Sequence, residues 1–305
     1  MGRGRRTKKT KNKLLGYVVA VLFLAVATVY GIYEYTNNGA EILGGTTFGN
    51  VEIDEDLLNI FFFDVGQGDS TLIISNGKTM LIDGGDVGYG QRVVDYLNTL
   101  NITRIDYLIV THAHADHIGG MTAVVNNFEI GTVHMPETDH PTRAVRNFLL
   151  AMQENNLEYE LVEIGDIIRL GNAELEVMFV DNTKPTNLNS TCIILQMTYG
   201  NQKYLFMADA ERDIEEGVEW ESVNVLRVAH HGSNTSSRNS FLRQTTPEIA
   251  IISVGANNRY NHPRDAVLER LTNIGAEIYR TDEHGTIWLT SDGRRNTITF
   301  LREEE

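Results

Sequence analysis

The heptapeptide THAHADH, residues 111–117, constrains this chain more than any other stretch of its sequence. It follows directly on the apolar run YLIV, which predicts a buried β-strand, so the heptapeptide would form the loop where that strand ends. Imidazole nitrogens combined with a carboxylate suit divalent transition metals such as zinc or manganese. The sequence therefore predicts a metal site at a strand end, with four candidate ligands within six residues: His112, His114, Asp116 and His117.

Other interpretations of this loop are weaker. A single histidine in a polar loop is usually solvated, but four potential ligands so close together argue against that interpretation. Structural zinc sites are mostly built from cysteine, and Cys192 is the only cysteine in the chain. An intramolecular disulfide is excluded for the same reason, so the ligands of any metal must be histidine and carboxylate.

The N-terminus predicts a location. Residues 1–13 carry seven Lys and Arg and no acid, and the uncharged run 14–33 follows them. About 20 apolar residues are enough to cross a bilayer as a helix, and the basic flank predicts which side stays cytoplasmic. We expect a basic cytoplasmic tail over 1–13, a transmembrane anchor or signal-anchor over 14–33, a linker over 34–56 and an extracytoplasmic domain over 57–305. A cleaved signal peptide is the alternative, since residues 25–27 have the small-x-small form of a cleavage site, and it would make the domain secreted.

Charge limits the partners of the expected extracytoplasmic part. Without the tail, 19 Lys and Arg stand against 41 Asp and Glu, which gives a formal charge near −22. Such a surface repels polyanions at long range, so contact with nucleic acid or teichoic acid needs a local source of positive charge. Bound metal is one such source. Arginines also occur near the motifs, but the sequence does not show that they share a face: Arg227, Arg238, Arg243, Arg259 and Arg264.

The pattern after residue 57 predicts a mixed α/β (α+β) fold. Short β-rich runs bounded by Gly, Asn or Asp are interspersed with segments whose apolar residues recur at three- and four-residue spacing. Strands in runs with helices between them favour two sheets packed together and covered by helices. Helices are expected over residues 89–100, 142–155, 212–218 and 264–274, with one half ending near residue 155 and a second beginning near 159.

The HxHxDH pattern after an apolar strand resembles the signature of the metallo-β-lactamase fold superfamily. That resemblance, over residues 57–301, implies a four-layer αββα sandwich with the site at one edge of the two sheets. Seven segments in order further resemble the extracytoplasmic lactamase-like domain of the competence protein ComEC: FFFDVGQGDSTLI (61–73), LIDGGD (81–86), THAHADHIGG (111–120), FMADAE (206–211), VAHHGSNTS (228–236), SVGANNRYNHP (253–263) and YRTDEHGTI (279–287). A channel of many transmembrane helices does not fit a chain with one apolar span. We therefore expect a stand-alone anchored relative, without DNA uptake itself.

The resemblance implies a centre of two divalent metal ions, Zn²⁺ or Mn²⁺. His112 and His114 would hold the first ion, and Asp116 and His117 the second. The remaining ligands implied are a bridging aspartate and one histidine of the HHGS segment. We expect His231 to be that ligand and His230 to reach the substrate, with the reverse assignment open. The full expected set is His112, His114, Asp116, His117, Asp209 and His231.

Further roles follow from the resemblance and from position in the chain. A histidine common in the superfamily is missing, and Asn189 and Ser190 occupy its place, so the first ion would have fewer protein ligands and these residues could contact substrate. Tyr260, Asn261 and His262 lie in a loop after a predicted strand, and such loops often carry substrate contacts. Asp83 is expected to orient the ligand imidazoles. Asp64 is expected to support the site from the DVGQGD turn, with a simple tight hairpin as the alternative. The expected substrate contacts are His230, Asn189, Ser190, Tyr260, Asn261 and His262.

These expectations predict a hydrolase. Two ions would lower the pKa of a shared water and stabilise charge on the oxygens of a phosphodiester. The catalytic residues would be Asp116, Asp209 and His230, and the substrate a phosphodiester, with DNA as the leading candidate. The alternatives are an esterase acting on phosphorylcholine of a cell-envelope teichoic acid, a β-lactam hydrolase and a metal-dependent binding module without turnover. The sequence predicts contact with the membrane through residues 14–33 and gives no basis for a protein partner.

Overall fold

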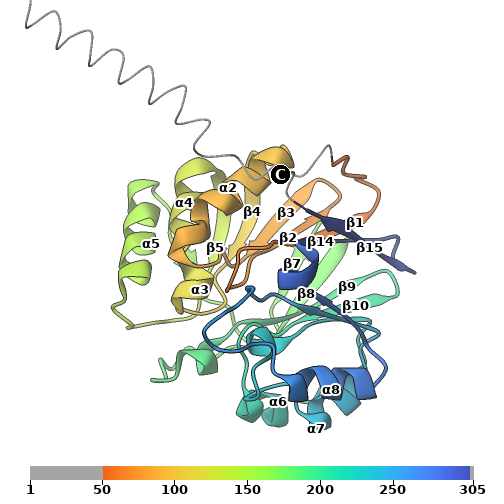
Figure 1. Cartoon of the computed structure of the whole chain (residues 1–305). Coiled ribbons are helices and arrows are strands. Elements are labelled where there is room, and N and C mark those ends of the chain that lie inside the picture. Colours follow the sequence, from red (N-terminus) through yellow and green to blue (C-terminus); the bar gives the residue numbers. More distant parts are fainter. Residues whose placement is uncertain (1–50, 303–305) are drawn as a thin grey trace, which may run out of the picture. The chain divides into compact units, whose positions relative to one another are not determined.

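The computed structural model describes residues 51–302, and the predicted tail and membrane span lie outside this range (Figure 1). Within the described residues, no helix has the length and apolar character needed to cross a bilayer. Val51 and Ile53, in the predicted linker, are partly buried against the first hydrophobic core described below. Ordered packing therefore includes residues ahead of the first strand.

The first of two sheets combines antiparallel and parallel pairing. Its strand order is β15-β14-β1-β2-β3-β4-β5-β6. Neighbours are antiparallel from β15 to β3 and parallel from β3 to β6. The strands are β1 (Leu58–Phe62), β2 (Thr71–Ser75), β3 (Lys78–Ile82), β4 (Arg104–Ile109), β5 (Glu129–His134), β6 (Tyr159–Glu160), β14 (Thr286–Ser291) and β15 (Asn296–Leu301).

The second sheet has the same mixed character. Its order is β13-β12-β11-β10-β9-β8-β7, antiparallel from β7 to β10 and parallel from β10 to β13. Each sheet thus has a parallel half, and in a parallel pair both strands end at the same edge. The strands are β7 (Ile167–Leu170), β8 (Ala173–Phe179), β9 (Ile194–Tyr199), β10 (Gln202–Phe206), β11 (Val225–Arg227), β12 (Ile249–Ile252) and β13 (Glu277–Arg280).

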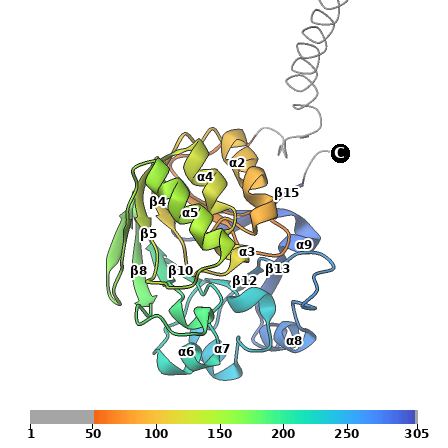
Figure 2. The same cartoon turned by 90° about the vertical axis from the view of Figure 1, so that its left-hand side faces the viewer.

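Helices cover the outer face of each sheet (Figures 1 and 2). The first sheet carries α2 (Gly90–Thr99), α4 (Met121–Asn127) and α5 (Arg143–Glu154), and the second carries α6 (Arg212–Gly217), α7 (Asn239–Thr245) and α8 (Asp265–Asn273). The four predicted helices are confirmed to within two residues at each end, whereas α4 and α7 were not predicted. Short helical turns complete the chain: η1 (Val87–Tyr89), α3 (Ala115–Ile118), η2 (Leu188–Thr191), η3 (Ala229–Gly232) and α9 (Thr281–His284).

Three hydrophobic cores hold these four layers together. Along β1, Phe61 faces the helices of the first sheet, whereas Ile60 and Phe62 face the second sheet. Because both faces are covered, the strand has apolar residues at consecutive positions rather than in alternation. A third core joins the second sheet to its helices through residues such as Leu226 and Phe241. The predicted sandwich of two helix-covered sheets is confirmed.

Candidate metal centre

The THAHADH loop joins β4 to the short helix α3. His112 follows the strand, His114 is the N-cap of α3, and His117 lies inside its single turn. This tight path brings the rings together, since the centroids of His112 and His117 are 4.1 Å apart. His112 Nε2 also lies 3.0 Å from His114 Nδ1. The loop alone therefore gathers three imidazoles at the carboxyl end of a parallel strand, where ligands of α/β sheets commonly bind.

Asp83, after the neighbouring strand β3, orients two of these imidazoles. Its Oδ2 lies 2.7 Å from His117 Nδ1 and accepts a hydrogen bond of 2.6 Å from the Thr111 hydroxyl. The Thr111 oxygen lies 3.1 Å from His112 Nδ1, so it can accept from that nitrogen. With Nδ1 as the donor in both contacts, each ring presents its Nε2 to the interior, where a proton or a metal cation can bind. Asp83 is fully buried and has a positive φ of 58°, which holds its carboxylate behind the rings.

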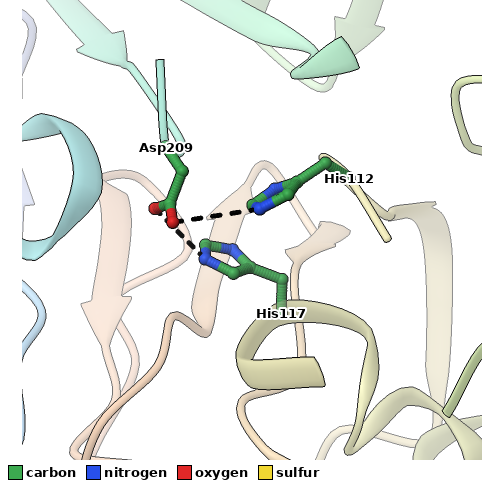
Figure 3. A group of neighbouring side chains, drawn as sticks. All are labelled: His112, His117 and Asp209. Carbon is green, nitrogen blue, oxygen red and sulfur yellow. Dashed lines mark ion pairs between the residues drawn. The ribbon is translucent and has the colours of Figure 1, made fainter. Parts of the chain in front are cut away.

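Asp209 approaches the same imidazoles from the other sheet, in the turn after β10. Its Oδ1 lies 3.2 Å from His117 Nε2, and its Oδ2 lies 3.9 Å from His112 Nε2 (Figure 3). His231 and Asp116 complete the cluster: His231 Nε2 is 3.5 Å from Asp209 Oδ1 and 3.5 Å from Asp116 Oδ2. Asp209 therefore occupies the position between two groups of ligand atoms.

The two histidines of the HHGS segment have different surroundings. Both are in the left-handed region of φ, within the turn η3 that follows β11. His231 is buried, and its Nδ1 donates to the Ser253 carbonyl oxygen at 2.8 Å, which leaves Nε2 bare and facing Asp116 and Asp209. His230 is partly exposed, with its Nε2 3.6 Å from Asp209 Oδ2. The structure thus groups His231 with the buried ligand atoms and places His230 beside the open cavity.

The buried donor atoms suit divalent metal ions. Among the described residues, His117 Nε2, His231 Nε2 and Asp209 Oδ1 are buried and have no hydrogen-bond partner. Bare imidazole nitrogens that face carboxylate oxygens repel them, and cations between these atoms would remove the repulsion. Candidate groups of ligand atoms within 4.8 Å of one another are His112 with His117 and Asp209, and Asp116 with His117 and His231.

The electrostatics of the cluster point the same way. Although burial opposes its charge, the Asp209 and Asp83 carboxylates hold the pKa of His117 well above its usual range. Burial likewise opposes the charge of Asp209, yet the neighbouring His117 and His231 hold its pKa well below the usual range. Burial lowers the pKa of His112, which keeps that ring neutral. The field that favours a proton on His117 also favours a metal cation at the same place.

One interpretation of the arginines is wrong. Arg227, considered above as a source of surface charge, is 1% exposed. Its Nη2 lies 2.6 Å from Asp69 Oδ2, and its Nη1 donates to the carbonyl oxygens of Ala208 and Val228 at 2.7 and 2.9 Å. A basic residue within the apolar segment VLRVA was the available signal for this buried role. Arg227 joins the second sheet to the DVGQGD turn of the first, and its carbonyl partners immediately precede Asp209 and the AHHG turn.

Several of the candidate metal ligands line a cavity of about 680 Å³. Only some of the residues that were predicted to contact substrate line it as well. Tyr260 and His262 line this cavity, whereas Asn189, Ser190 and Asn261 are absent from its lining. Asn189 is buried in η2, and its Oδ1 has no hydrogen-bond partner among the described residues. Other lining residues that the sequence did not single out for substrate contact are Gln67, Asp86, Ala115 and Arg259.

The DVGQGD turn contacts the site through its backbone. The carboxylate of Asp64 accepts from the Gly66 amide at 3.0 Å, as in a tight turn, and Asp64 lines a separate cavity with Thr281 and Thr286. Gly68 is the closer residue, because a methyl group added to it would lie 2.5 Å from the carbonyl oxygen of Asp116. The adjacent Asp69 amide donates to that same oxygen at 3.0 Å. Glycine at 68 thus permits the close approach that supports Asp116.

Fold and site together define a metal-dependent hydrolase with a histidine and aspartate centre at the edge of an αββα sandwich. Residues 63–256 match the model of the metallo-beta-lactamase superfamily, and the chain belongs to this superfamily. Its solved relatives include the metallo-beta-lactamase fold protein YhfI from Bacillus subtilis, with a TM-score of 0.53 and 13% identity over 77% of this chain and 100% of that one. At this identity the likeness concerns the fold alone.

Curated relatives confirm the resemblance to ComEC-like lactamase domains. The chain is 30% identical over 77% of its length to ComE operon protein 3 of Bacillus subtilis (strain 168), covering 33% of that protein. It is 27% identical over 81% of its length to the competence protein ComA of Neisseria gonorrhoeae, covering 34%. Recombination protein 2 of Haemophilus influenzae is 29% identical over 73% of the chain, with 28% covered. The chain thus spans about a third of these relatives.

Proposed function

We propose that this protein is a metal-dependent phosphodiesterase of nuclease type that acts outside the cytoplasm. The observation that carries the proposal is the composition of the 680 Å³ cavity, in which the ligand atoms of Asp116, Asp209 and His231 adjoin the cationic or hydrogen-bonding side chains of His230 and Arg259. A phosphodiester needs both: cations at its oxygens and donors around them. The names of the curated relatives, which refer to competence and recombination, support a nucleic-acid substrate.

The candidate ligands form two sets, one for each metal ion. His112, His114 and Asp209 would hold one ion, and Asp116, His117, His231 and the shared Asp209 the other. Bound there, two divalent cations supply Lewis-acid stabilisation of phosphoryl oxygens and lower the pKa of a water molecule. Asp83, directly and through Thr111, keeps the imidazoles in the tautomer that presents Nε2. Such partners of metal ligands typically contribute 10- to 100-fold to metal affinity or activity.

His230 is the side chain best placed to exchange a proton in the reaction. Its Nδ1 lies 3.0 Å from the Thr235 hydroxyl and 3.6 Å from Glu211 Oε1, which fixes the ring with Nε2 toward Asp209. Hydrolysis consumes one water, whose oxygen bonds to phosphorus as one P–O ester bond breaks. His230 would donate a proton to the leaving oxygen and would be restored by the proton that the attacking water releases.

The proposed location rests on the basic residues 1–13 and the uncharged run 14–33, which would anchor the chain and leave the hydrolase domain outside. Protease added to intact cells tests this location, since digestion of the domain is expected before lysis. Protection until the cells are lysed would contradict it.

Turnover by the full chain in detergent tests the proposed activity. We expect cleavage of single-stranded DNA and of bis-p-nitrophenyl phosphate with Mn²⁺ or Zn²⁺, loss of activity with a chelator, and no turnover of the β-lactam nitrocefin. Asp209→Asn should lower kcat by at least about 100-fold, because it removes the carboxylate between the two groups of ligands. Absence of phosphodiester turnover with either metal would refute the proposal, and release of phosphocholine from teichoic acid instead would favour the esterase.

A further inference from the structure

The loop from Gly255 to Pro263 forms one wall of the catalytic cavity and follows β12 of the second sheet. Arg259, Tyr260 and His262 line the cavity from this loop. Among the described residues that line the cavity, Arg259 is the one Arg or Lys, whereas three residues carry a carboxylate: Asp86, Asp116 and Asp209. A basic residue in an acidic cavity of an acidic protein raises the question of what it binds.

The loop is held in a fixed shape. Asn258 lies at its centre, where its side-chain nitrogen donates to the carbonyl oxygens of Gly255 and His262 at 2.9 and 2.6 Å. Its side-chain oxygen accepts from the amides of Tyr260 and His262 at 3.2 and 3.0 Å. The start of the loop is also fixed, because a methyl group on Gly255 would lie 2.4 Å from the amide nitrogen of Gln67. The loop therefore presents its outer side chains in a set position.

Arg259 is oriented by its neighbour rather than by an acid. Its Nη2 donates to the Tyr260 hydroxyl at 2.6 Å, and its guanidinium carbon lies 4.8 Å from the centre of the Tyr260 ring. Within residues 51–302, Asp86 and Asp116 act on Arg259 only through their charge, and its side-chain hydrogen bond goes to Tyr260. A surface arginine with a structural role commonly pairs with a carboxylate. This guanidinium keeps donors available, and some of its conformational freedom is already lost before a ligand binds.

A row of rings connects Arg259 to the metal centre. The Tyr260 ring is stacked with His262 at 5.7 Å and 24°, and His262 meets His230 edge-on at 5.7 Å. His230 in turn lies 3.6 Å from Asp209. Arg259 thus lines the cavity at the far end of a row of rings that leads to Asp209. A phosphate next along the substrate from the one at His230 and the ligands would lie beside this guanidinium.

We infer that Arg259, oriented by Tyr260, forms a subsite for a second phosphate, next along the chain from the phosphodiester that is cleaved. This inference rests on the proposed phosphodiesterase function and identifies the preferred substrate as a polymer of phosphodiesters. Guanidinium and phosphate form charge-assisted hydrogen bonds, which are stronger than neutral ones. Tyr260 is 40% exposed, so its ring edge is accessible to a nucleobase beside that phosphate. This favours nucleic acid over a polyol phosphate.

Binding to the full chain in detergent tests the subsite without requiring turnover. The probes are thymidine 3′,5′-bisphosphate, which carries two phosphates, and thymidine 5′-monophosphate, each measured by calorimetry with Mn²⁺ and with chelator. The wild-type chain is expected to prefer the bisphosphate, and Arg259→Ala to lose about tenfold or more of the bisphosphate affinity while keeping monophosphate affinity. Arg259→Lys should retain part of the preference, because it keeps the charge but loses the planar donor set.

Arg294→Ala is the matched control, because Arg294 is also exposed and lies outside the cavity lining. It changes the net charge by the same amount and should bind both probes like the wild type. Equal losses in the two variants would mean that only net charge matters and would overturn the inference. An unchanged preference for the bisphosphate in Arg259→Ala would overturn it as well.

Two further experiments complete the test. One asks whether the bound phosphate must belong to a nucleoside, and the other distinguishes failure of the subsite from failure of the proposed function. Propane-1,3-diol bisphosphate has the same phosphate spacing without a nucleoside, and Arg259→Ala should weaken it too. A loss confined to the thymidine probe would assign Arg259 to the base and overturn the phosphate subsite. In turnover, wild type should cleave pTpT faster than TpT and Arg259→Ala should abolish the difference. If wild type cleaves neither dinucleotide, the proposed function fails, while the binding preference still decides the subsite.

Discussion

Replacing Arg227 with methionine is expected to destabilise the fold strongly, because it leaves a buried charge without a partner. Asp69 is 3% exposed and has its Oδ2 2.6 Å from Arg227 Nη2. The change also removes the donors to the carbonyl oxygens of Ala208 and Val228. Removing one partner of a buried ion pair typically costs about 3–5 kcal/mol. Domains of this size are stable by only about 5–15 kcal/mol, so the loss would be a large fraction of the total.

Urea unfolding of the full chain in detergent and chelator measures this loss. Both tryptophans, Trp220 and Trp288, lie in the hydrolase domain, so their fluorescence reports on its unfolding. Chelator removes the contribution of bound metal to the free energy of unfolding. In the double variant with Asp69→Asn, the stranded charge is gone, and we expect recovery of about 2 kcal/mol relative to Arg227→Met alone. A single variant within about 0.5 kcal/mol of wild type would refute the buried-pair reasoning, as would a double variant as unstable as the single one.

Three further predictions test other contacts. Asp83→Asn should lower metal affinity about 10- to 100-fold, because it weakens the orientation of the His117 imidazole; competition with a chromogenic chelator measures it, and unchanged affinity would contradict the role. Gly68→Ala should cost more stability than Gly77→Ala, since its methyl group meets the Asp116 carbonyl oxygen at 2.5 Å whereas Gly77 has nothing within 4 Å; equal unfolding midpoints would contradict this. Burial raises the pKa of Glu215 to about 7, although hydrogen bonds from the amides at the N-terminus of α7 lower it. The folded state therefore binds this proton more tightly than the unfolded state does. The free energy of unfolding should therefore fall by roughly 3 kcal/mol between about pH 4.5 and pH 7.5, and Glu215→Gln should flatten this slope; a slope identical to wild type would count against it.

The parts of the molecule that were predicted correctly depend on local patterns. Recurrence of apolar residues at helical spacing located α2, α5, α6 and α8, because each buries one stripe against a sheet. The THAHADH loop needed only a strand before it and a tight turn within it to bring imidazoles together. By contrast, the apolar residues of α7 are the adjacent Phe241 and Leu242 alone, so its sequence lacks the three- or four-residue recurrence that marks the other helices.

The remaining differences concern residues whose neighbours come from distant parts of the chain. Arg227 is basic in sequence and buried in structure, because Asp69, more than 150 positions earlier, lies opposite it. Asn189 and Asn261 are polar and near motifs, yet the cavity lining leaves them out. Arg259 had no signal beyond its charge, and its orientation depends on contacts with Tyr260 that only the folded loop provides.

The sequence by itself determined which chemistry is available: four candidate ligands in one loop, a further aspartate and a histidine pair in recognisable segments, and no cysteine cluster. It also determined the two-sheet character of the fold. Only the tertiary structure decided that Asp209 and His231 meet His117 across the two sheets, and that Asp83 orients two rings at once. Side-chain chemistry and periodicity are local properties of a chain, whereas distances between remote residues depend on which strands become neighbours and on how the sheets pack.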